Sequence, residues 1–392
     1  MDFDIPEELK MVQSMVRDFV TDQLKPLERI VLGRAADLSD AQMFLPPDKE
    51  QELMGMVKDM GLWGVGVPEE LGGAGLGTLG TCLVEEELAQ TVLPFDLGDV
   101  TPLLFDCNEQ QKELYFKPAL NREKLPYLAL MEPAKEASEP ENLALRAEKS
   151  NGSYVLSGKK LSLSRPGEDY FAVVFATSSP EGPVREGVSC FLVDKGSPGF
   201  SVAGDEEISG WEARERRPLS LVFDRCKVGV ENMLGEEGKA FQLGKKWLPA
   251  RRIVRGARCV GAAQRILDEC TIQAQTWTSF GQTISGRPSV QAALADIATN
   301  IHAARLMAYE AAWKADQGQS VQRQAAMVKL FATQMVHFVA DNAAHIFNAP
   351  AYVGGLPIER FCGNAIAAST TRLALQLQRN IIARDILKGL KV

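Results

Sequence analysis

Three side chains that commonly bind metals lie near one another late in the sequence. His337, Asp341 and His345 follow at intervals of four residues, so they would share one face of a helix. Eight residues of helix rise about 12 Å, which is too far for the first and last side chains to reach one ion easily. We therefore expect solvated or packed side chains here and predict no metal site.

Two further segments carry groups that can bind phosphate. GGAGLG at Gly72–Gly77 has the glycines of a dinucleotide-binding loop, but no βαβ pattern surrounds it, so we reject that interpretation. The run RRIVRGAR at Arg251–Arg258 is basic and lies on an expected helix. It could reach the phosphates of coenzyme A or the acidic groups of a partner, although a solvated helix face would show the same pattern.

The cysteines do not indicate a metal or redox site. The sequence has seven cysteines, and no two of them form a C-x-x-C pair, which leaves zinc and thioredoxin-like sites without support. We expect small, buried or half-buried thiols in a reducing compartment.

Length and composition indicate a large, acidic globular protein. The chain has 392 residues, enough for two or three domains and a large buried core. Its net charge of −8 disfavours a surface for nucleic acid or anionic membranes. No apolar run approaches the ~18 residues that cross a bilayer, and the opening MDFDIPEELK is not typical of a targeting segment. We expect a cytoplasmic protein that binds neither nucleic acid nor membrane.

The apolar pattern divides the chain into three parts. Residues 1–125 show helical spacing, for example at Val12, Val16 and Phe19. Residues 126–235 contain short apolar runs separated by Gly, Pro and Ser, which is typical of an antiparallel barrel or sandwich. Residues 236–392 are helical again. The expected strands are Tyr154–Gly158, Tyr170–Ala176, Val188–Asp194 and Leu219–Phe223.

One helix of the last part carries a regular apolar seam. Its apolar residues step 4-3-4-3-4, as in a helix packed within a bundle. They exceed what one partner helix in the same chain would need, so we predict an oligomer, either a dimer or a dimer of dimers. The seam residues are Val290, Leu294, Ile297, Ile301, Ala304 and Ala308.

The order of these parts and several local motifs resemble the acyl-CoA dehydrogenase family over essentially the whole chain. The motifs are the opening MDFDIPEELKMVQSMVRDFV, the segment Val67–Ala89, ALMEP at Ala129–Pro133, LGEEGKAF at Leu234–Phe241, and the helix Leu294–Trp313. The resemblance implies an α+β multidomain fold with an N-terminal helical domain, a central antiparallel β-barrel or sandwich, and a C-terminal four-helix bundle.

The same resemblance implies the chemistry. Members of the family dehydrogenate an acyl-CoA thioester between Cα and Cβ, with FAD bound at a subunit interface. A carboxylate removes the α-proton, and FAD accepts the hydride because no side chain can do so. The implied partners are an acyl-CoA substrate, further subunits and an electron-transfer acceptor protein.

The residues that would hold the flavin ring are partly retained. The family's Thr that bonds the ring falls on Met131, where only the backbone can donate. Its G-S-D serine falls on Ser138, after an insertion, and its W-I-T turn falls on 162–164. Leu163 and Ser164 take the last two positions of that turn, and Ser164 keeps a hydroxyl, while the covering Trp is lost. A polar loop would also contain such serines.

The residues that a neighbouring subunit would supply look degraded. Phe280 and the following Gly survive, but the Arg that would hold the pyrophosphate is replaced by Trp277. The family's Q-x-x-G-G-x-G becomes HIFNAPA at residues 345–351, where each Cβ obstructs close approach of a ligand. We therefore expect FAD to bind weakly, or only with a partner subunit. The implied positions on this side are Trp277, Phe280, Gln291, His345 and Ala349.

The catalytic carboxylate of the family is missing. Its usual position lies fifteen residues after the Pro matched by Pro357 and seven before the Arg matched by Arg379, and both counts give Arg372. Some members place the base on the first bundle helix instead, where this chain has Arg251. An arginine has a pKa above about 12 and only donates hydrogen bonds, so it cannot be a general base. We predict no catalytic carboxylate at either position.

Three interpretations remain open. The first is a base-less subunit of a hetero-oligomeric acyl-CoA dehydrogenase, like those that act on steroid side chains or other catabolic acyl-CoAs. The second is a flavoenzyme that needs no carboxylate, similar to the monooxygenases and desulfinases of this family. The third is a homo-oligomeric dehydrogenase with a relocated base.

Overall fold

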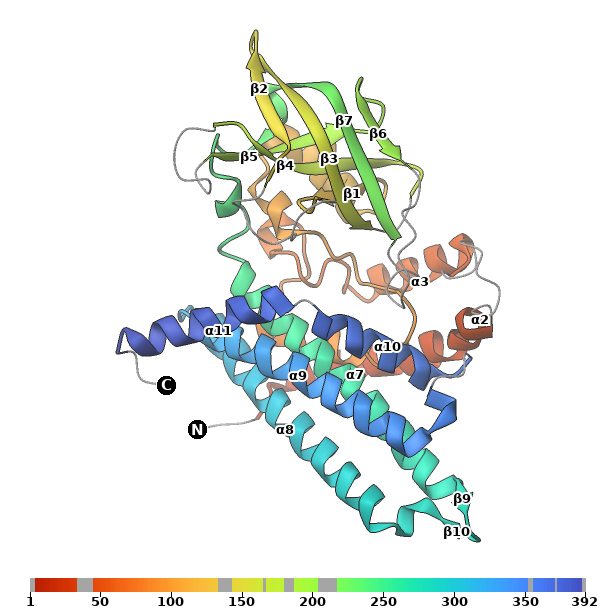
Figure 1. Cartoon of the computed structure of the whole chain (residues 1–392). Helices are drawn as coiled ribbons and strands as arrows, with labels where there is room; N and C mark the ends of the chain where they lie inside the picture. Colours follow the sequence, from red (N-terminus) through yellow and green to blue (C-terminus); the bar gives the residue numbers. More distant parts are fainter. Residues whose placement is uncertain are drawn as a thin grey trace. The chain divides into compact units, whose positions relative to one another are not determined.

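The computed structural model describes residues 4–33, 45–132, 143–164, 167–179, 187–203, 217–351, 355–370 and 372–389. The chain separates into two compact units. The helical unit contains Met1–Gly66, Ala74–Leu97 and Pro249–Val392, and the sheet unit contains Val67–Gly73 and Gly98–Leu248. Figure 1 shows the helices and strands of each unit in sequence colours. The expected order of helices, strands and helices is confirmed.

The N-terminal part of the helical unit begins with an amphipathic helix, α1. It starts after Pro6 with two acidic residues in its first turn, a favourable end for the helix dipole, and it buries Val16 and Phe19 as the spacing predicted. A π-helical turn, η1, continues α1 directly. The described elements are α1 (Glu7–Phe19), η1 (Val20–Leu24), η2 (Lys25–Leu27), α2 (Glu28–Gly33), α3 (Pro47–Asp59) and α4 (Gly77–Leu88).

The C-terminal part of the helical unit is a bundle with a short hairpin at one end. The hairpin, β9 (Thr278–Ser279) paired with β10 (Gln282–Thr283), joins the two longest helices. Within the described ranges of the chain, no helix is long and apolar enough to span a membrane. The elements are α7 (Leu248–Thr276), η12 (Ile284–Gly286), α8 (Pro288–Asp316), α9 (Gln322–Phe347), η13 (Ala349–Ala351), α10 (Pro357–Thr370) and α11 (Arg372–Leu387).

The apolar seam of α8 faces other helices of the same chain. Five of its six residues are buried, and Leu294 packs partly buried against the same core. The seam is therefore covered without a helix from a second subunit, and the expected oligomer stays a prediction. Large apolar side chains that remain exposed on α8 are Leu306 (45% exposed) and Trp313 (51%).

Two glycines let α7 approach its neighbours closely. A Cβ at Gly261 would lie 1.9 Å from the carbonyl oxygen of Glu86 in α4, and one at Gly256 would lie 2.3 Å from Val328 Cγ1 in α9. Real Cβ contacts are never so short, so at Gly261 only glycine permits the approach of the Glu86 backbone, whereas at Gly256 a Cβ would require the Val328 side chain to move.

The sheet unit is built around one eight-stranded sheet. The strand order is β6-β7-β3-β2-β4-β5-β8, and β1 pairs with β4 off this path. Most pairs are antiparallel, as expected, but β1 and β2 pair with β4 in parallel. The strands are β1 (Leu125–Ala129), β2 (Arg146–Ser150), β3 (Ser153–Ser164), β4 (Tyr170–Thr177), β5 (Val188–Asp194), β6 (Phe200–Ala203), β7 (Arg217–Gly229) and β8 (Met233–Leu234).

The central strands β4 and β5 of the sheet are buried on both faces. Alternate residues of β4 enter two different apolar clusters, with Phe171 and Val173 in one and Ala172 and Val174 in the other. This explains why β4 reads as a continuous apolar run rather than an alternating one. The short helices η5 (Pro102–Asp106), η6 (Lys112–Phe116) and α6 (Lys117–Leu120) supply part of the first cluster, and α5 (Glu109–Gln111) lies between η5 and η6 in the sequence.

Candidate functional site

A buried ion pair lies beside the segment expected to hold the flavin ring. The Lys160 ammonium of β3 donates to Glu132 Oε1 over 2.8 Å and to the Leu130 carbonyl oxygen over 3.3 Å. The Glu132 carboxylate also accepts from the backbone N–H groups of Ala144 (2.8 and 2.9 Å) and Leu145 (3.0 Å). The Lys160 side chain is fully buried and that of Glu132 is 7% exposed. We call these two residues the Glu132–Lys160 clasp.

The clasp is held together by charge against the effect of burial. Burial acts to raise the pKa of Glu132, but the hydrogen bonds from Lys160, Leu145 and Ala144 outweigh it and leave that pKa below its ordinary value. Burial lowers the pKa of Lys160, and the neighbouring Glu132 offsets only part of this effect. Each charge is therefore tolerated only because the other is present.

The clasp ties two predicted flavin-binding segments together. The Leu161 N–H donates to the Met131 carbonyl oxygen over 2.8 Å, which bridges the segment after β1 to β3. Met131 and Leu161 form an antiparallel bridge, in which the backbone N–H and carbonyl groups of the two residues face each other. Beyond Leu161, β3 continues through Leu163 and Ser164, paired with Pro218 and Arg217 of β7.

The structure describes only some of the other residues that were predicted to hold the flavin ring. Leu163 and Ser164 lie in β3 by their backbone, but their side chains fall outside the described ones. Ser138 lies outside the described residues. Met131, Leu163 and Ser164 are thus carried by the two segments that the clasp joins.

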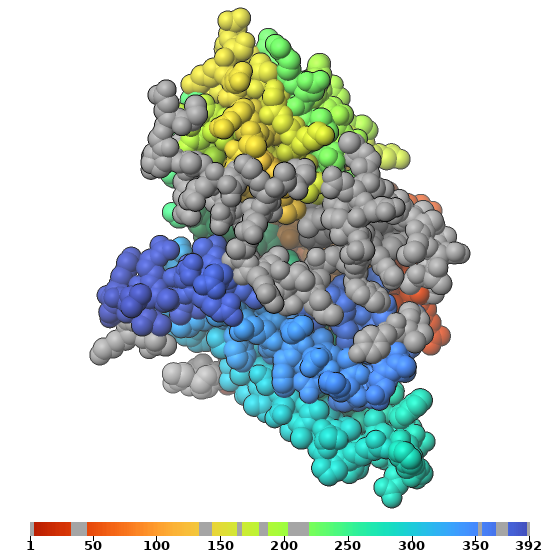
Figure 2. All heavy atoms as spheres, viewed as in Figure 1, coloured from red at the N-terminus to blue at the C-terminus, as the bar shows by residue number. Residues whose placement is uncertain are grey.

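The bundle residues that were predicted to contact the diphosphate part of FAD lie at the hairpin end of the bundle. Ile284 and Val290, next to the hairpin, share one core cluster with Phe347 and Ala351 at the end of α9. The side chains of the predicted positions themselves point outward. Those of Trp277 (54%) and Phe280 (100%) are exposed, as are those of Gln291, His345 and Ala349. Figure 2 shows the segment around the hairpin as a protruding tip on the visible face.

Two residues at this end have backbone angles that favour glycine. Phe280 has φ 54° at the hairpin tip, and the Arg287 guanidinium lies 5.9 Å from its ring centroid. Asn348 has φ 57° and ψ −132° where α9 ends. A non-glycine residue in such a conformation is strained by about 1–3 kcal/mol. The backbone at Asn348 thus has a conformation that suits glycine.

The expected base positions both begin helices. Arg372 is the first residue of α11, and its side chain is not among those described. Arg251 lies in the first turn of α7 and is half-buried. The possible metal ligands His337, Asp341 and His345 are exposed, and among the described residues no cluster of His, Cys, Asp or Glu could hold a metal ion.

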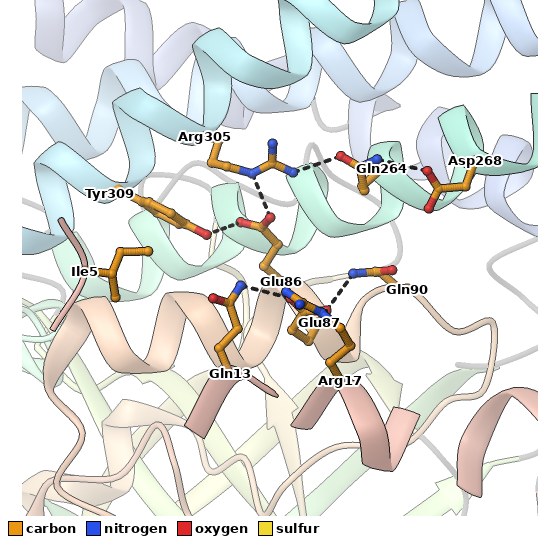
Figure 3. Close-up of a pocket in the computed structure, with 10 residues that line it drawn as sticks. All are labelled: Ile5, Gln13, Arg17, Glu86, Glu87, Gln90, Gln264, Asp268, Arg305 and Tyr309. Atoms are coloured by element: carbon orange, nitrogen blue, oxygen red, sulfur yellow. Dashed lines mark hydrogen bonds and ion pairs between the residues drawn. The ribbon is translucent and has the colours of Figure 1, made fainter. Parts of the chain in front are cut away.

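A polar cavity that the sequence did not predict lies within the helical unit, between α1, α4, α7 and α8. It measures about 520 Å³. Figure 3 shows its side chains pointing toward one another. The lining residues are Ile5, Gln13, Arg17, Glu86, Glu87, Gln90, Gln264, Asp268, Arg305 and Tyr309.

The two buried carboxylates of this cavity already have partners. Glu86 accepts from Arg305 Nε and from the Tyr309 hydroxyl, each over 2.8 Å. Glu87 accepts from Arg17 (2.6 Å) and from Gln13 (2.9 Å). Burial raises the pKa of Glu86 despite the opposing effect of Arg305.

An acyl-binding pocket is lined mainly by hydrophobic and aromatic side chains, and here Ile5 and Tyr309 are the only lining residues of these kinds. We interpret the cavity as a structural junction. The sequence feature that could have predicted this cavity is the run of three glutamates at residues 85–87 in an apolar helix, because buried acids require partners.

Three family models match almost the entire chain. They are described as the acyl-CoA dehydrogenase N-terminal domain, matching residues 6–123, the middle domain, matching residues 128–225, and the C-terminal domain, matching residues 241–387.

Individual relatives match over their full lengths. The chain is 31% identical to (R)-benzylsuccinyl-CoA dehydrogenase of Thauera aromatica, over 99% of this chain and 97% of that protein. It is 30% identical to an acyl-CoA dehydrogenase of Bacillus subtilis, over 98% and 99%. Among solved structures, butyryl-CoA dehydrogenase of Megasphaera elsdenii is 26% identical, with a TM-score of 0.79 over 99% of this chain and 100% of that one.

Proposed function

Because the chain belongs to the acyl-CoA dehydrogenase family, we propose that it is the base-less subunit of a hetero-oligomeric, FAD-dependent acyl-CoA dehydrogenase. Members of the family use FAD, bind acyl-CoA and pass electrons to an electron-transferring flavoprotein. In the proposed assembly a related chain supplies the carboxylate that this chain lacks.

The observation that carries this proposal is arginine at both base positions. Removing the α-proton of a thioester requires a group that accepts a proton, and Arg372 and Arg251 can only donate. Loss of a general base removes a contribution of roughly 10²–10⁴-fold. A chain with this substitution is therefore expected to contribute binding surface rather than the proton-transfer step.

The two proposed halves of the flavin site differ in how well they fit FAD. On the sheet unit, the clasp fixes the segment that carries Met131 against β3, and this is the place that the resemblance gives to the flavin ring. When bound, FAD would supply the hydride acceptor. On the bundle end, the exposed Trp277 can stack on an aromatic base but cannot neutralise a diphosphate. This half does not fit the diphosphate, and a partner with a cation there would complete it.

The proposal is tested by reconstitution. The purified chain is assayed with acyl-CoAs and an artificial electron acceptor, alone and after mixing with a second family chain that carries glutamate at the position matched by Arg372. We expect little turnover alone and turnover in the mixture, with co-elution of the two chains. Rapid turnover by this chain alone would contradict the proposal and favour a relocated base.

A flavoenzyme that needs no carboxylate is the second candidate. The hydroxyl groups of Ser138 and Ser164, which stand where the resemblance places the flavin ring, favour it. Tight, stoichiometric FAD on the chain purified alone, without dehydrogenase turnover, would support this candidate over the first.

A further inference from the structure

Three cationic side chains gather where α7 packs against α9. The two helices lie close together at Gly256, where a Cβ would lie 2.3 Å from Val328 Cγ1 and 3.6 Å from Ala332 Cβ. Lys329 directly follows Val328, and Arg252 and Arg255 precede Gly256 within about one helical turn. The close contact therefore brings the three positive charges together at one side of the helix crossing.

Two of these cations have no counter-charge. Within the described part of the chain, neither Arg252 nor Lys329 makes a hydrogen bond or an ion pair, and both are half-buried. Burial lowers the pKa of Arg252. Burial, followed by repulsion from Arg255 and Arg252, lowers the pKa of Lys329. Each of these cations is thus held where its charged form is disfavoured.

Other buried or half-buried arginines of the same helical unit show the usual arrangement. Arg265 pairs with Glu28 over 3.1 Å, Arg305 pairs with Glu86 over 2.8 Å, and Arg258 pairs with Glu85. An anion bound here would offset both the burial of these two unpaired charges and the repulsion between the cations.

We infer that Arg252 and Lys329 form a subsite for an oxyanion of the bound ligand, either the free carboxylate of a dicarboxylic acyl group or a phosphate of coenzyme A. The inference rests on the proposed function, which makes an acyl-CoA the ligand. Arg252 directly follows Arg251, at which the proposed function places the reacting end of the ligand. This placement favours the acyl carboxylate, and the chain would then prefer thioesters of dicarboxylic acids.

Calorimetric titration of the full chain with FAD present tests the subsite. Glutaryl-CoA and pentanoyl-CoA have acyl chains of equal length and differ in the terminal carboxylate, and coenzyme A alone carries only the phosphates. We expect glutaryl-CoA to bind at least about 10-fold more tightly than pentanoyl-CoA, which is the effect of one charge-assisted hydrogen bond. Lys329→Met should abolish this difference. Lys314→Met, which removes the partly exposed partner of Glu310, is the matched control and should leave it unchanged.

The outcomes distinguish an acyl carboxylate from a coenzyme A phosphate as the bound oxyanion, and they distinguish failure of the subsite from failure of the proposed function. If Lys329→Met weakens all three ligands equally, the subsite holds a phosphate. If the unmodified chain binds all three equally and Lys329→Met changes none, the subsite does not exist, while the proposed function stands. If no acyl-CoA binds, both fail. Removal of an unpaired cation does not weaken folding, so thermal unfolding of Lys329→Met should occur at or above the temperature of the unmodified chain.

Discussion

The strongest prediction concerns the Glu132–Lys160 clasp. Lys160→Met keeps the length and apolar stem of the side chain but removes the ammonium that lies 2.8 Å from Glu132 Oε1. Removing one partner of a buried ion pair typically destabilises a protein by about 3–5 kcal/mol. Glu132 keeps the N–H donors of Ala144 and Leu145, so we expect the lower end of this range, about 3 kcal/mol.

Equilibrium urea unfolding measures this change in the sheet unit. Trp247 reports on that unit, because its ring packs edge-on against Phe105 with centroids 5.5 Å apart. The matched control is Lys149→Met, which removes an exposed pair with Glu237 and should change stability by less than about 1 kcal/mol. Combining Lys160→Met with Glu132→Met removes both charges and should restore much of the lost stability.

The stability lost in Lys160→Met should also depend on pH, and the pKa of Glu132 fixes the direction of this dependence. The pKa of Glu132 is lowered in the folded protein, so its ion pair contributes stability above the unfolded-state pKa of about 4.3, and this stability is lost as the pH falls through the lower folded pKa. The difference between the unmodified chain and Lys160→Met should therefore shrink in acid. A loss below 1 kcal/mol at neutral pH, equal to that of Lys149→Met, would refute the reasoning.

Three further predictions follow from local geometry. Gly261→Ala should destabilise the helical unit by about 1–3 kcal/mol, since its Cβ would lie 1.9 Å from a carbonyl oxygen, whereas Gly55→Ala in α3 has no atom within 4 Å and should be neutral or stabilising in thermal unfolding. Asn348→Gly should stabilise by up to about 1 kcal/mol by removing strain at φ 57°, and Asn348→Ala should destabilise; calorimetric scanning distinguishes them. Trp277→Arg should tighten FAD binding by roughly 10- to 150-fold in titration calorimetry, and an unchanged affinity would contradict the proposed role of this position.

The sequence was sufficient for the fold because apolar periodicity is a local signal. The four expected strands all lie within observed strands, and the seam of α8 is buried as its spacing required. The parallel pairing of β1 with β4 was not predictable, because a strand's own residues do not show which way its partner runs.

The candidate site was less accessible to sequence reasoning because its contacts join distant residues. Glu132 and Lys160 are 28 positions apart in the sequence. They become neighbours only because β3 pairs with the segment after β1, and the sequence does not show this pairing. The same holds for Arg252 and Lys329, which meet only because Gly256 lets two helices approach. The basic run at Arg251–Arg258 was visible, but the sequence could not show that Arg258 is paired with Glu85 while Arg252 has no ion pair among the described residues.

The most direct test of the central claim is flavin reduction by the chain alone. The purified chain is saturated with FAD and mixed anaerobically with those acyl-CoAs that calorimetry shows to bind, while absorbance at the flavin maximum is followed. If the chain lacks a base, none of the bound acyl-CoAs should bleach the flavin over minutes. Bleaching within seconds by any of them would contradict the account, because a carboxylate elsewhere in this chain would then be removing the α-proton.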